Sequence, residues 1–480
     1  MRSLASVLAL FLLALLACGG EPAPSVDVRL PDPPPASVLI RDVSVLEVDT
    51  GTLTPDRDVL LEGARIAAIE PSRGAGGGLE GGPDTRVVDG AGATLVPGLI
   101  DMHGHIVANS NPSWNRGSPD PEANLRAYAY AGVTTVFDPA DMSDDPWGRR
   151  ARVAAGELVG PRIFTTGPLL TTPDGHPISI IQQLAPWWIS WYLEGLVAIP
   201  LPDVATAEAQ VDEIAAGGAD AVKIVIDAIP LEAPRMPPEI AKAVVERAKS
   251  HGLRTVAHIG TTEDARVAAD AGVALWVHGV YKERIPDDQI AVLAAYGIPM
   301  VATIEVFDRY ARGTRGPIVP TRLERETVPA ELLASFYPVP EDFEVGTLSS
   351  WLALMGETMD ARIDNVRRLR AAGVTILAGS DTQSGVFPGA GLHRELANLV
   401  RAGMTPAEAI RAATLDPATW LANGSEPDSG LVAVGKRADL LLVEGDPSAD
   451  VEALSRLRAV FLAGVPVERT PVPGAVPAAP

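Results

Sequence analysis

The stretch Pro97-Gly-Leu-Ile-Asp-Met-His-Gly-His105 joins a short apolar segment directly to two histidines. Residues 99–103 have the length and composition of a buried strand. Side chains two positions apart on a strand point the same way, so the imidazoles of His103 and His105 are expected to face one centre. The stretch therefore predicts a strand whose carboxyl end carries two neighbouring ligands.

Further short apolar strands follow this one, and segments of helical period separate them. We expect these strands at residues 133–137, 162–166, 222–226, 255–259, 275–278, 299–303 and 375–378. Eight β/α repeats within residues 97–424 predict an α/β fold, a (β/α)8 TIM barrel. A doubly wound open sheet is the alternative, but no Gly-rich phosphate-binding fingerprint follows any of these strands.

Short apolar runs broken by Gly and Asp turns mark the two flanks of the barrel, residues 37–96 and 425–470. Period-two patterning with such punctuation is typical of antiparallel strands. Because each flank is too short for a domain of its own, we expect both terminal segments to form one small β-sandwich together. The barrel would then be inserted between its two halves.

Residues 1–17 have the pattern of a signal peptide, in which Arg2 precedes an apolar run at 7–16 that is too short to span a bilayer. The run ends in Leu15-Leu16-Ala17-Cys18, which resembles a bacterial lipobox. That resemblance implies cleavage before Cys18, acylation of the new terminus, and an exported protein that a lipid anchors in the bacterial cell envelope. An ordinary secretory signal is the alternative.

Composition adds three constraints. Cys18 is the only cysteine, so no disulfide can form within the chain. Residues 18–36 are rich in Gly, Pro and acidic side chains and are expected to be a lipidated tether, while 471–480 is expected to be a Pro-rich tail. The 39 basic and 61 acidic residues give a net charge of −22 without a basic tract, which argues against a nucleic-acid partner.

Further candidate ligands lie where later strands end, the place where barrels gather functional residues. His258 ends the fifth strand, His278 ends the sixth, and Asp381 follows the eighth. A single buried histidine is more commonly structural. Four histidines and an aspartate at strand ends, however, form a ligand set for a borderline ion such as zinc. The sequence therefore predicts a metal centre at His103, His105, His258, His278 and Asp381.

Lys223 lies inside the buried strand pattern Asp220-Ala-Val-Lys-Ile-Val-Ile226, where an unpaired ammonium is costly. Burial shifts the pKa of a lysine readily, and the neutral amine is a nucleophile. Its reaction with carbon dioxide would give a carbamate, an anion able to bridge two metal ions. The alternative is a lysine paired with a nearby carboxylate.

Two segments near the expected barrel mouth are candidates for substrate specificity. Residues 186–193 contain four Trp and Tyr side chains, and residues 305–350 are rich in Pro and aromatic side chains. We expect both to be loops that act as lids or binding elements. For the aromatic cluster, a membrane surface and an oligomer contact are the alternatives.

Together these motifs resemble the amidohydrolase superfamily. The matching pieces are residues 97–105, Gly132-Val-Thr-Thr-Val136, Gly218-Ala-Asp-Ala-Val-Lys-Ile224, His258, His278, Leu377-Ala-Gly-Ser-Asp381 and Gly435-Lys-Arg-Ala-Asp-Leu440. The resemblance covers residues 37 to about 467. It is greatest to the imidazolonepropionase-like and Xaa-Pro dipeptidase-like branch, in which a strand-four lysine in a Gly-Ala-Asp-x-x-Lys context is carbamylated.

The resemblance implies two divalent metal ions, with zinc expected. One ion would be held by His103, His105 and Asp381, the other by His258 and His278, with carbamylated Lys223 as the bridge. If Lys223 is unmodified, the fallback is a single ion on His103, His105, His258 and Asp381.

The resemblance also implies catalytic roles for two residues. His176, in Thr172-Pro-Asp-Gly-His-Pro177 after the third strand, matches a loop histidine that helps to polarise the substrate carbonyl. The alternative is a loop residue without a partner. Asp381 would take a proton from the water and pass it to the leaving amine. A structural role is expected for His393, and none is assigned to His251.

These expectations favour a metal-dependent hydrolase that acts on a small-molecule amide or peptide. The metal would lower the pKa of a bound water and polarise the scissile carbonyl. The expected reaction is hydrolysis of an amide C–N bond in a dipeptide or N-acyl amino acid. A hydrolase that opens a cyclic amide or imidazolone ring is one alternative, because the same chemistry serves both. A catalytically inactive binding lipoprotein is the other, and the complete ligand set argues against it.

Overall fold

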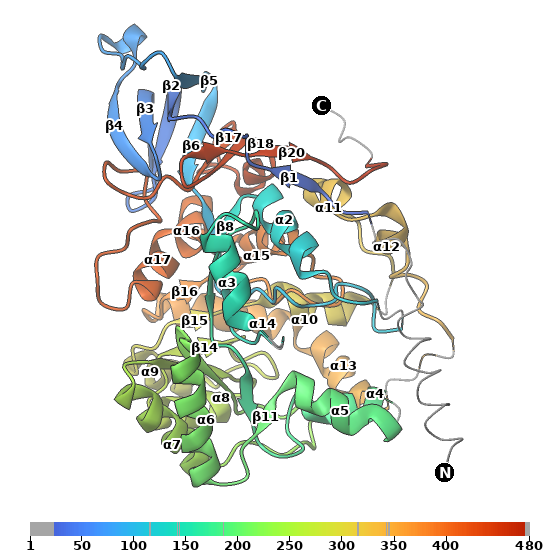
Figure 1. Cartoon of the computed structure of the whole chain (residues 1–480). Coiled ribbons are helices and arrows are strands. Elements are labelled where there is room, and N and C mark those ends of the chain that lie inside the picture. Colours follow the sequence, from blue (N-terminus) through green and yellow to red (C-terminus); the bar gives the residue numbers. More distant parts are fainter. Residues whose placement is uncertain are drawn as a thin grey trace.

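The computed structural model describes residues 24–475, apart from 115–116, 142, 144, 186, 314–315, 342 and 344–345. The expected signal peptide, Cys18 with residues 19–23 of the expected tether, and residues 476–480 of the expected tail lie outside the described residues. A β domain, in blue and red at the top of Figure 1, sits on a larger α/β part that carries the remaining helices. Within the described ranges, no helix combines the length and the apolar character needed to cross a membrane.

Strands from both flanks build the β domain as one eight-stranded sheet, ordered β19-β18-β17-β6-β2-β3-β4 with β5 paired to β2. The strands are β2 (Ser37–Glu47), β3 (Thr52–Glu62), β4 (Arg65–Pro71), β5 (Thr85–Asp89), β6 (Ala93–Pro97), β17 (Leu440–Glu444), β18 (Leu457–Leu462) and β19 (Val465–Pro466). The two flanks join where β6 and β17 pair antiparallel, with Leu95 opposite Leu442. Both of these leucines are buried in the core of the domain, which confirms a β domain formed by both terminal segments.

The central strands are parallel and arranged in two runs, β7-β8-β9 and β10-β12-β13-β14-β15-β16. Their bounds are β7 (Leu99–Asp101), β8 (Val133–Asp138), β9 (Arg162–Thr165), β10 (Leu169–Thr171), β12 (Ala221–Val225), β13 (Arg254–His258), β14 (Leu275–Val277), β15 (Met300–Val301) and β16 (Ile376–Leu377). The two runs of strands are joined to each other at both of their edges, which closes the barrel. Met102 N donates to Ala378 O at 3.0 Å, and Asp220 N donates to Thr165 O at 2.9 Å.

This arrangement confirms the (β/α)8 barrel. Its third position is shared by β9 and β10, because Gly167 and Pro168 interrupt the strand between them. Sequence patterning missed the three-residue β10 and the two-residue β11 (Ile199–Pro200), which pairs with β10.

Helices follow the barrel strands as the periodicity predicts. They are α2 (Pro121–Tyr130), α3 (Pro146–Ala154), α6 (Val204–Gly217), α7 (Pro238–Ser250), α8 (Thr262–Ala271), α9 (Asp287–Ala295), α14 (Met359–Ala371), α15 (Ala390–Arg401), α16 (Pro406–Ala412) and α17 (Leu415–Leu421). Local signals fix their ends. Asp203 caps the start of α6 through the Thr206 N–H, and Gly218, with φ at 88°, ends that helix.

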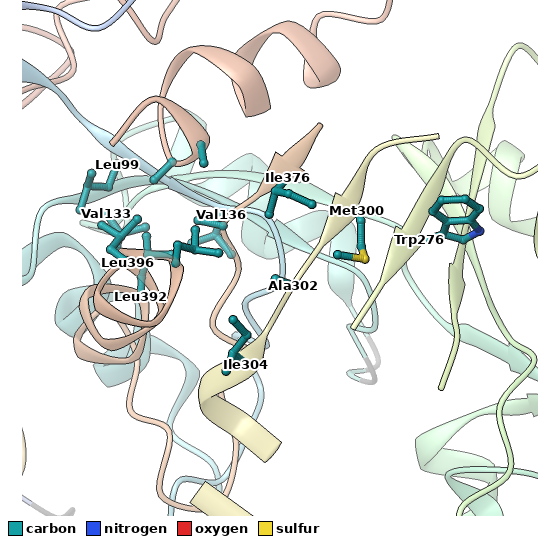
Figure 2. Close-up of a cluster of buried hydrophobic side chains, with 14 of the residues drawn as sticks. Leu99, Val133, Val136, Trp276, Met300, Ala302, Ile304, Ile376, Leu392 and Leu396 are labelled. Carbon is teal, nitrogen blue, oxygen red and sulfur yellow. The ribbon is translucent and has the colours of Figure 1, made fainter. Parts of the chain in front are cut away.

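Apolar side chains of the barrel strands pack against apolar side chains of the surrounding helices. Leu99, Val133 and Val136 on the first two strands lie beside Leu392 and Leu396 of α15 (Figure 2). All five side chains are fully buried. This packing holds the first strand, and therefore the histidines that follow it, against a rigid helix.

The segments expected to be a tether and a tail are partly folded onto the domain. Asp27–Arg29 forms strand β1, which pairs antiparallel with β20 (Glu468–Thr470). Val26 and Val28 are buried on this strand, and Val472 is buried beyond β20. The tether prediction was therefore wrong for residues 26–29, because two alternating valines outweigh the surrounding Pro and acidic residues.

Helices replace both segments that were expected to be loops. Residues 186–193 fall largely within α5 (Trp187–Val197), which follows α4 (Ile178–Leu184). Residues 305–350 contain α10 (Ile304–Gly313), α11 (Arg322–Thr327), α12 (Ala330–Ala334) and the start of α13 (Leu348–Glu357). The described residues also contain two short 3-10 helices, Arg73–Ala75 and Val451–Ser455.

Candidate metal centre and active site

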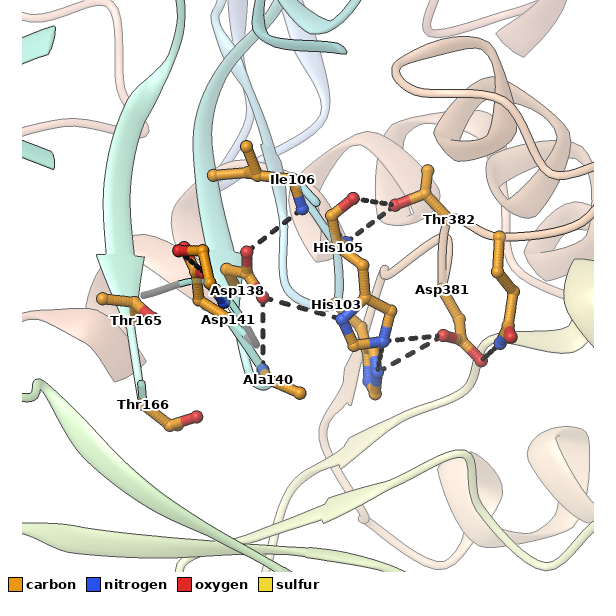
Figure 3. Close-up of polar contacts among 12 residues, drawn as sticks. His103, His105, Ile106, Asp138, Ala140, Asp141, Thr165, Thr166, Asp381 and Thr382 are labelled. Atoms are coloured by element: carbon orange, nitrogen blue, oxygen red, sulfur yellow. Dashed lines mark hydrogen bonds and ion pairs between the residues drawn. The ribbon is translucent and has the colours of Figure 1, made fainter. Parts of the chain in front are cut away.

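The first two predicted ligands follow β7 and lie side by side. His103 Nε2 is 3.1 Å from His105 Nε2. The backbone N–H of His105 donates to Thr382 Oγ1 at 2.7 Å, and that of His103 donates to Asp101 Oδ1 at 3.1 Å. Figure 3 shows both rings pointing toward Asp381, as the spacing of two residues predicts.

Asp381 lies at the centre of the cluster, just beyond β16. Its Oδ1 is 3.1 Å from His105 Nε2 and 3.5 Å from His103 Nε2, and its Oδ2 is 3.6 Å from His278 Nδ1. Gln383 Nε2 donates to the same Oδ2 at 3.0 Å. The backbone of Asp381 has a φ of 54°, a strained conformation for a residue with a side chain, which the surrounding structure holds in place.

His258 and His278 complete the ring of imidazoles. The centroid of the His278 ring lies 4.1 Å from that of His258 and 4.6 Å from that of His103. Asp227 Oδ2 lies 3.2 Å from His258 Nε2, and Thr303 Oγ1 lies 2.8 Å from His278 Nδ1. These contacts fix the orientation of each ring and leave Nδ1 of His258 and Nε2 of His278 available to an ion.

The donor set fits a divalent metal. Ligand atoms of His103, His278 and Asp381 lie within 4.8 Å of one another. Nδ1 of His103 is buried and has no hydrogen-bond partner among the described residues, and Oδ1 of Asp381 faces the Nε2 atoms of His103 and His105. Native structures rarely leave such atoms unpaired unless an ion or water serves them.

The protonation of the imidazoles also suits a metal, which binds their neutral form. Burial lowers the pKa of His258, and it lowers the pKa values of His103 and His278 well below the usual range. His105 differs, because the carboxylates of Asp138 and Asp381 outweigh the effect of burial and raise its pKa to about 9. An ion bound here would compete with that proton.

Lys223 extends from β12 into the same interior. Its side chain is buried, and no side chain within the described ranges forms a hydrogen bond or ion pair with its Nζ. Burial lowers the pKa of Lys223 to about 7, against a smaller opposing effect of Asp381. The paired lysine considered as an alternative is therefore not what the structure shows. With a pKa of about 7, roughly half of the amine is neutral at pH 7, and the neutral amine is the form that carbamylation requires.

His176 lies beside the centre, as predicted. Its ring centroid is 5.1 Å from that of His258, and it comes from the turn between β10 and α4. Burial holds the pKa of His176 well below its usual range, so the neutral ring can donate one hydrogen bond. Two other histidines lie outside the site, as expected. His251 contacts Asp212 at 2.7 Å, and His393 donates to Ala131 O at 2.8 Å.

Sequence reasoning missed the carboxylates that surround the ligands. Asp138 ends β8, and its Oδ1 is 3.6 Å from His105 Nδ1. Asp227 follows β12 and contacts His258, while Tyr281 and Lys282 both donate to it. An available signal was their position, since each acidic residue lies at the carboxyl end of a barrel strand.

The centre opens into an apolar cavity of about 280 Å³. His176, His258 and Asp381 lie at its polar end. The apolar wall comes mainly from α4, α10, α13 and the loops around them, and includes Trp114, Ile180, Leu184, Ile229, Phe307, Tyr310, Ile318, Phe336, Phe343, Leu348, Trp351 and Leu352. The segment 305–350 therefore does line the site, whereas no described residue of α5 does.

Arg309 is the one arginine or lysine among the described residues that line this cavity. Its Nη2 is 2.8 Å from Glu324 Oε1 and 3.1 Å from Glu305 Oε1. Arg394 also pairs with Glu324, so two cations face two carboxylates. The wall consequently offers no excess positive charge.

Comparison with known proteins agrees with this geometry. The model of the amidohydrolase family matches residues 94–467. An uncharacterised protein of Mycobacterium tuberculosis is 26% identical over 395 residues, which cover 80% of this chain and 90% of the relative.

Two solved structures share the fold at 22% identity. A Xaa-Pro dipeptidase with methionine bound in its active site has a TM-score of 0.71 and covers 90% of this chain and 99% of its own. Phenylurea hydrolase B has a TM-score of 0.70, with 92% and 100% covered. These neighbours show the fold, and the family match supports a hydrolase. Because the match spans most of its length, the chain belongs to the amidohydrolase family.

Proposed function

We propose that this protein is a metal-dependent hydrolase that cleaves an amide C–N bond in a dipeptide or N-acyl amino acid with a bulky apolar side chain. The observation that carries the proposal is the opening of a complete His and Asp ligand set into an apolar, aromatic-lined cavity. The Xaa-Pro dipeptidase that shares the fold is consistent with it.

Two zinc ions are the cofactors that the donor set suits best. One would be held by His103, His105 and Asp381, the other by His258 and His278, with carbamylated Lys223 between them. Bound divalent ions supply a Lewis acid for the carbonyl and lower the pKa of a water molecule. With Lys223 unmodified, a single ion on His103, His105, His258 and Asp381 is the fallback.

The chain's own residues then handle orientation and protons. Gln383 donates to Oδ2 of Asp381, while Oδ1 lies 3.1 Å from His105 Nε2 within the ligand cluster. From that position Oδ1 accepts a proton at the ligand cluster and delivers it to the leaving amine. His176, neutral and at the cavity wall, donates a hydrogen bond to the substrate carbonyl.

A second candidate rests on the charge of the cavity. Because Arg309 is already paired with two glutamates, the wall does not favour a free carboxylate. This favours a neutral substrate such as a cyclic amide, and the fold shared with phenylurea hydrolase B is in keeping with it.

A substrate panel tests both proposals. We expect a chelator to abolish hydrolysis and zinc or manganese to restore it. His103→Ala should remove activity, whereas His251→Ala on the surface should not. Dipeptides and N-acyl amino acids with Phe or Leu are then compared with cyclic amides of similar size. Activity that is indifferent both to the chelator and to His103→Ala would contradict the metal-dependent mechanism.

We also propose that the protein is exported and lipid-anchored at Cys18 in the bacterial cell envelope. The support is the Leu15-Leu16-Ala17-Cys18 motif after an apolar run. Mass spectrometry of the mature N-terminal peptide should find an acylated Cys18. An uncleaved or unacylated N-terminus would contradict this assignment.

A further inference from the structure

Helix α5 turns an apolar face outward, which is unusual for a helix on a water-exposed surface. The exposed residues include Trp188, Trp191, Tyr192 and Leu196, with exposed fractions of 57%, 73%, 52% and 38%. Their spacing of three and four residues places them on one face of the helix. Surface helices normally turn such a stripe toward the core.

The inner side of α5 holds its two polar side chains, beside apolar residues such as Val197 that are partly buried. Ser190 is buried and donates to Glu194 Oε1 at 2.6 Å, and Glu194 is half-buried. Glu194 is the one charged residue in the helix, which contains no lysine or arginine. The outward face of α5 is therefore uncharged and aromatic, and the structure described here places nothing over it.

We propose that this face of α5 rests in the interfacial region of a lipid bilayer. Trp and Tyr combine a large apolar ring with a polar N–H or O–H, a chemistry suited to the boundary between lipid chains and water. An aromatic helix face of this kind binds by lying in the plane of that boundary. The occupant is thus a membrane surface.

The position of the chain's N-terminal end supports a bilayer as the partner. The lipobox-like motif ends at Cys18, six positions before Pro24, the first described residue. Pro24 shares a surface groove with Leu332 of α12. In Figure 1, α12 lies at the upper right of the molecule and α5 at its lower right. A lipid on Cys18 would keep the whole chain, and with it α5, within reach of a membrane.

The size of the patch argues against a second copy of the chain. A buried aromatic side chain covers about 150–250 Å², so three that are half to three-quarters exposed present roughly 400 Å². Stable interfaces bury about 800 Å² on each partner. The patch alone falls well short of that area, whereas insertion into an interface has no such requirement.

Docking through α5 would bring the cavity close to the lipid. Helix α4 packs against α5, and its Ile180 and Leu184 belong to the apolar wall of the cavity. Apolar substrates that partition into the membrane would then be concentrated near the mouth. The surface itself does not depend on the proposed reaction.

Quenching of tryptophan fluorescence by brominated lipid tests the proposal. The full chain, with its own N-terminus, is reconstituted into phosphatidylcholine vesicles with and without bromine on the upper acyl chain. We expect bromine to quench the wild type. The pair Trp188→Phe and Trp191→Phe should lose most of that quenching, which would assign the signal to α5.

A second pair of substitutions tests membrane docking while leaving both fluorescent tryptophans in place. Tyr192→Ser with Leu196→Ser keeps both tryptophans but removes half of the apolar face, so quenching should fall. Val319→Ser, at an exposed valine outside α5, is the matched control and should leave quenching unchanged. Hydrolysis of a water-soluble substrate should be equal in all variants.

Two results would overturn the proposal. The first is an anchored wild type whose fluorescence brominated lipid does not quench. The second is a chain that self-associates in sedimentation experiments, with an unquenched α5, and that Tyr192→Ser with Leu196→Ser converts to monomers. That outcome would make the face an oligomer contact.

Discussion

The floor and the wall of the cavity are built by opposite means. The floor consists of polar side chains at the ends of barrel strands, fixed by short contacts such as that of Asp227 with His258 and by positive φ angles at His278 and Asp381. The wall consists mainly of apolar side chains on α4, α10 and α13, which pack against one another, with the ion-paired Arg309 among them.

This difference implies a division of labour. A misplaced ligand at the floor alters the chemistry directly, because the reacting groups need near-exact geometry. A missing methyl or ring in the wall changes only how well a substrate group is buried. We therefore expect floor variants to lower kcat and wall variants to change KM and substrate preference.

The largest effect is expected from Asp381→Asn. The amide keeps the shape of the side chain but cannot accept the proton, and general acid–base catalysis of this kind contributes about 10²–10⁴-fold. kcat should fall by that factor or more, since a metal ligand is weakened as well. Asp212→Asn, at the surface near His251, should retain wild-type kcat. Equal activity of the two variants would remove Asp381 from the mechanism.

Asp227→Asn should have the next largest effect. Asp227 accepts from Tyr281 and Lys282 while it orients His258, and loss of such a supporting carboxylate costs about 10–100-fold in metal affinity or activity. Metal titration of the purified protein should show weakened binding, and excess zinc should restore part of the activity. Unchanged metal affinity would mean that Asp227 serves the structure alone.

Carbon-13 NMR with labelled bicarbonate tests Lys223 directly. Carbamate forms on the neutral amine, and a pKa of about 7 makes this form abundant above pH 7 and scarce below it. A lysine with its ordinary pKa of about 10.4 would remain protonated until far higher pH. We expect a carbamate signal that grows as the pH rises through 7 and is absent in Lys223→Met. A signal that persists in this variant would come from another lysine.

The floor was largely predictable from the sequence because its ligands sit in short motifs at strand ends. His103 and His105 point together as their spacing requires, and His258, His278 and Asp381 follow their predicted strands. The roles of Asp138 and Asp227 were not predicted, because a lone aspartate after a strand is common in turns. Their importance becomes visible only when the folded barrel places each beside a histidine.

The wall could not be derived in the same way. Helix α10 does have a helical apolar pattern, which the sequence interpretation overlooked. Helices α11 and α12 are short and flanked by prolines, so their stability comes from packing on the barrel and not from local periodicity. Strand β1 was missed for a related reason. Asp27–Arg29 has little strand signal alone and becomes ordered through pairing with β20, which lies more than 430 residues away.

Trp114→Ala should produce a smaller effect that is confined to the wall. Trp114 lies half-buried in the cavity, with its ring 5.3 Å from that of Phe343. Loss of apolar contact in a binding pocket costs about 1–3 kcal/mol, or roughly 10–200-fold in kcat/KM for a bulky substrate. KM should carry most of that change, and small substrates should be unaffected. Tyr337→Ala, at an exposed tyrosine, is the control.

The smallest effect is expected from Glu324→Gln, which changes the charge of the wall without changing its shape. Glu324 pairs with Arg309 and Arg394, so its neutralisation leaves one uncompensated positive charge beside the cavity. An opposite charge nearby favours an anion, so KM for substrates with a free carboxylate should fall several-fold while KM for neutral amides stays constant. Paired KM measurements on a dipeptide and its C-terminal amide would show this, with thermal unfolding to confirm that the variant remains folded. If neither KM changes, Arg309 does not face the substrate.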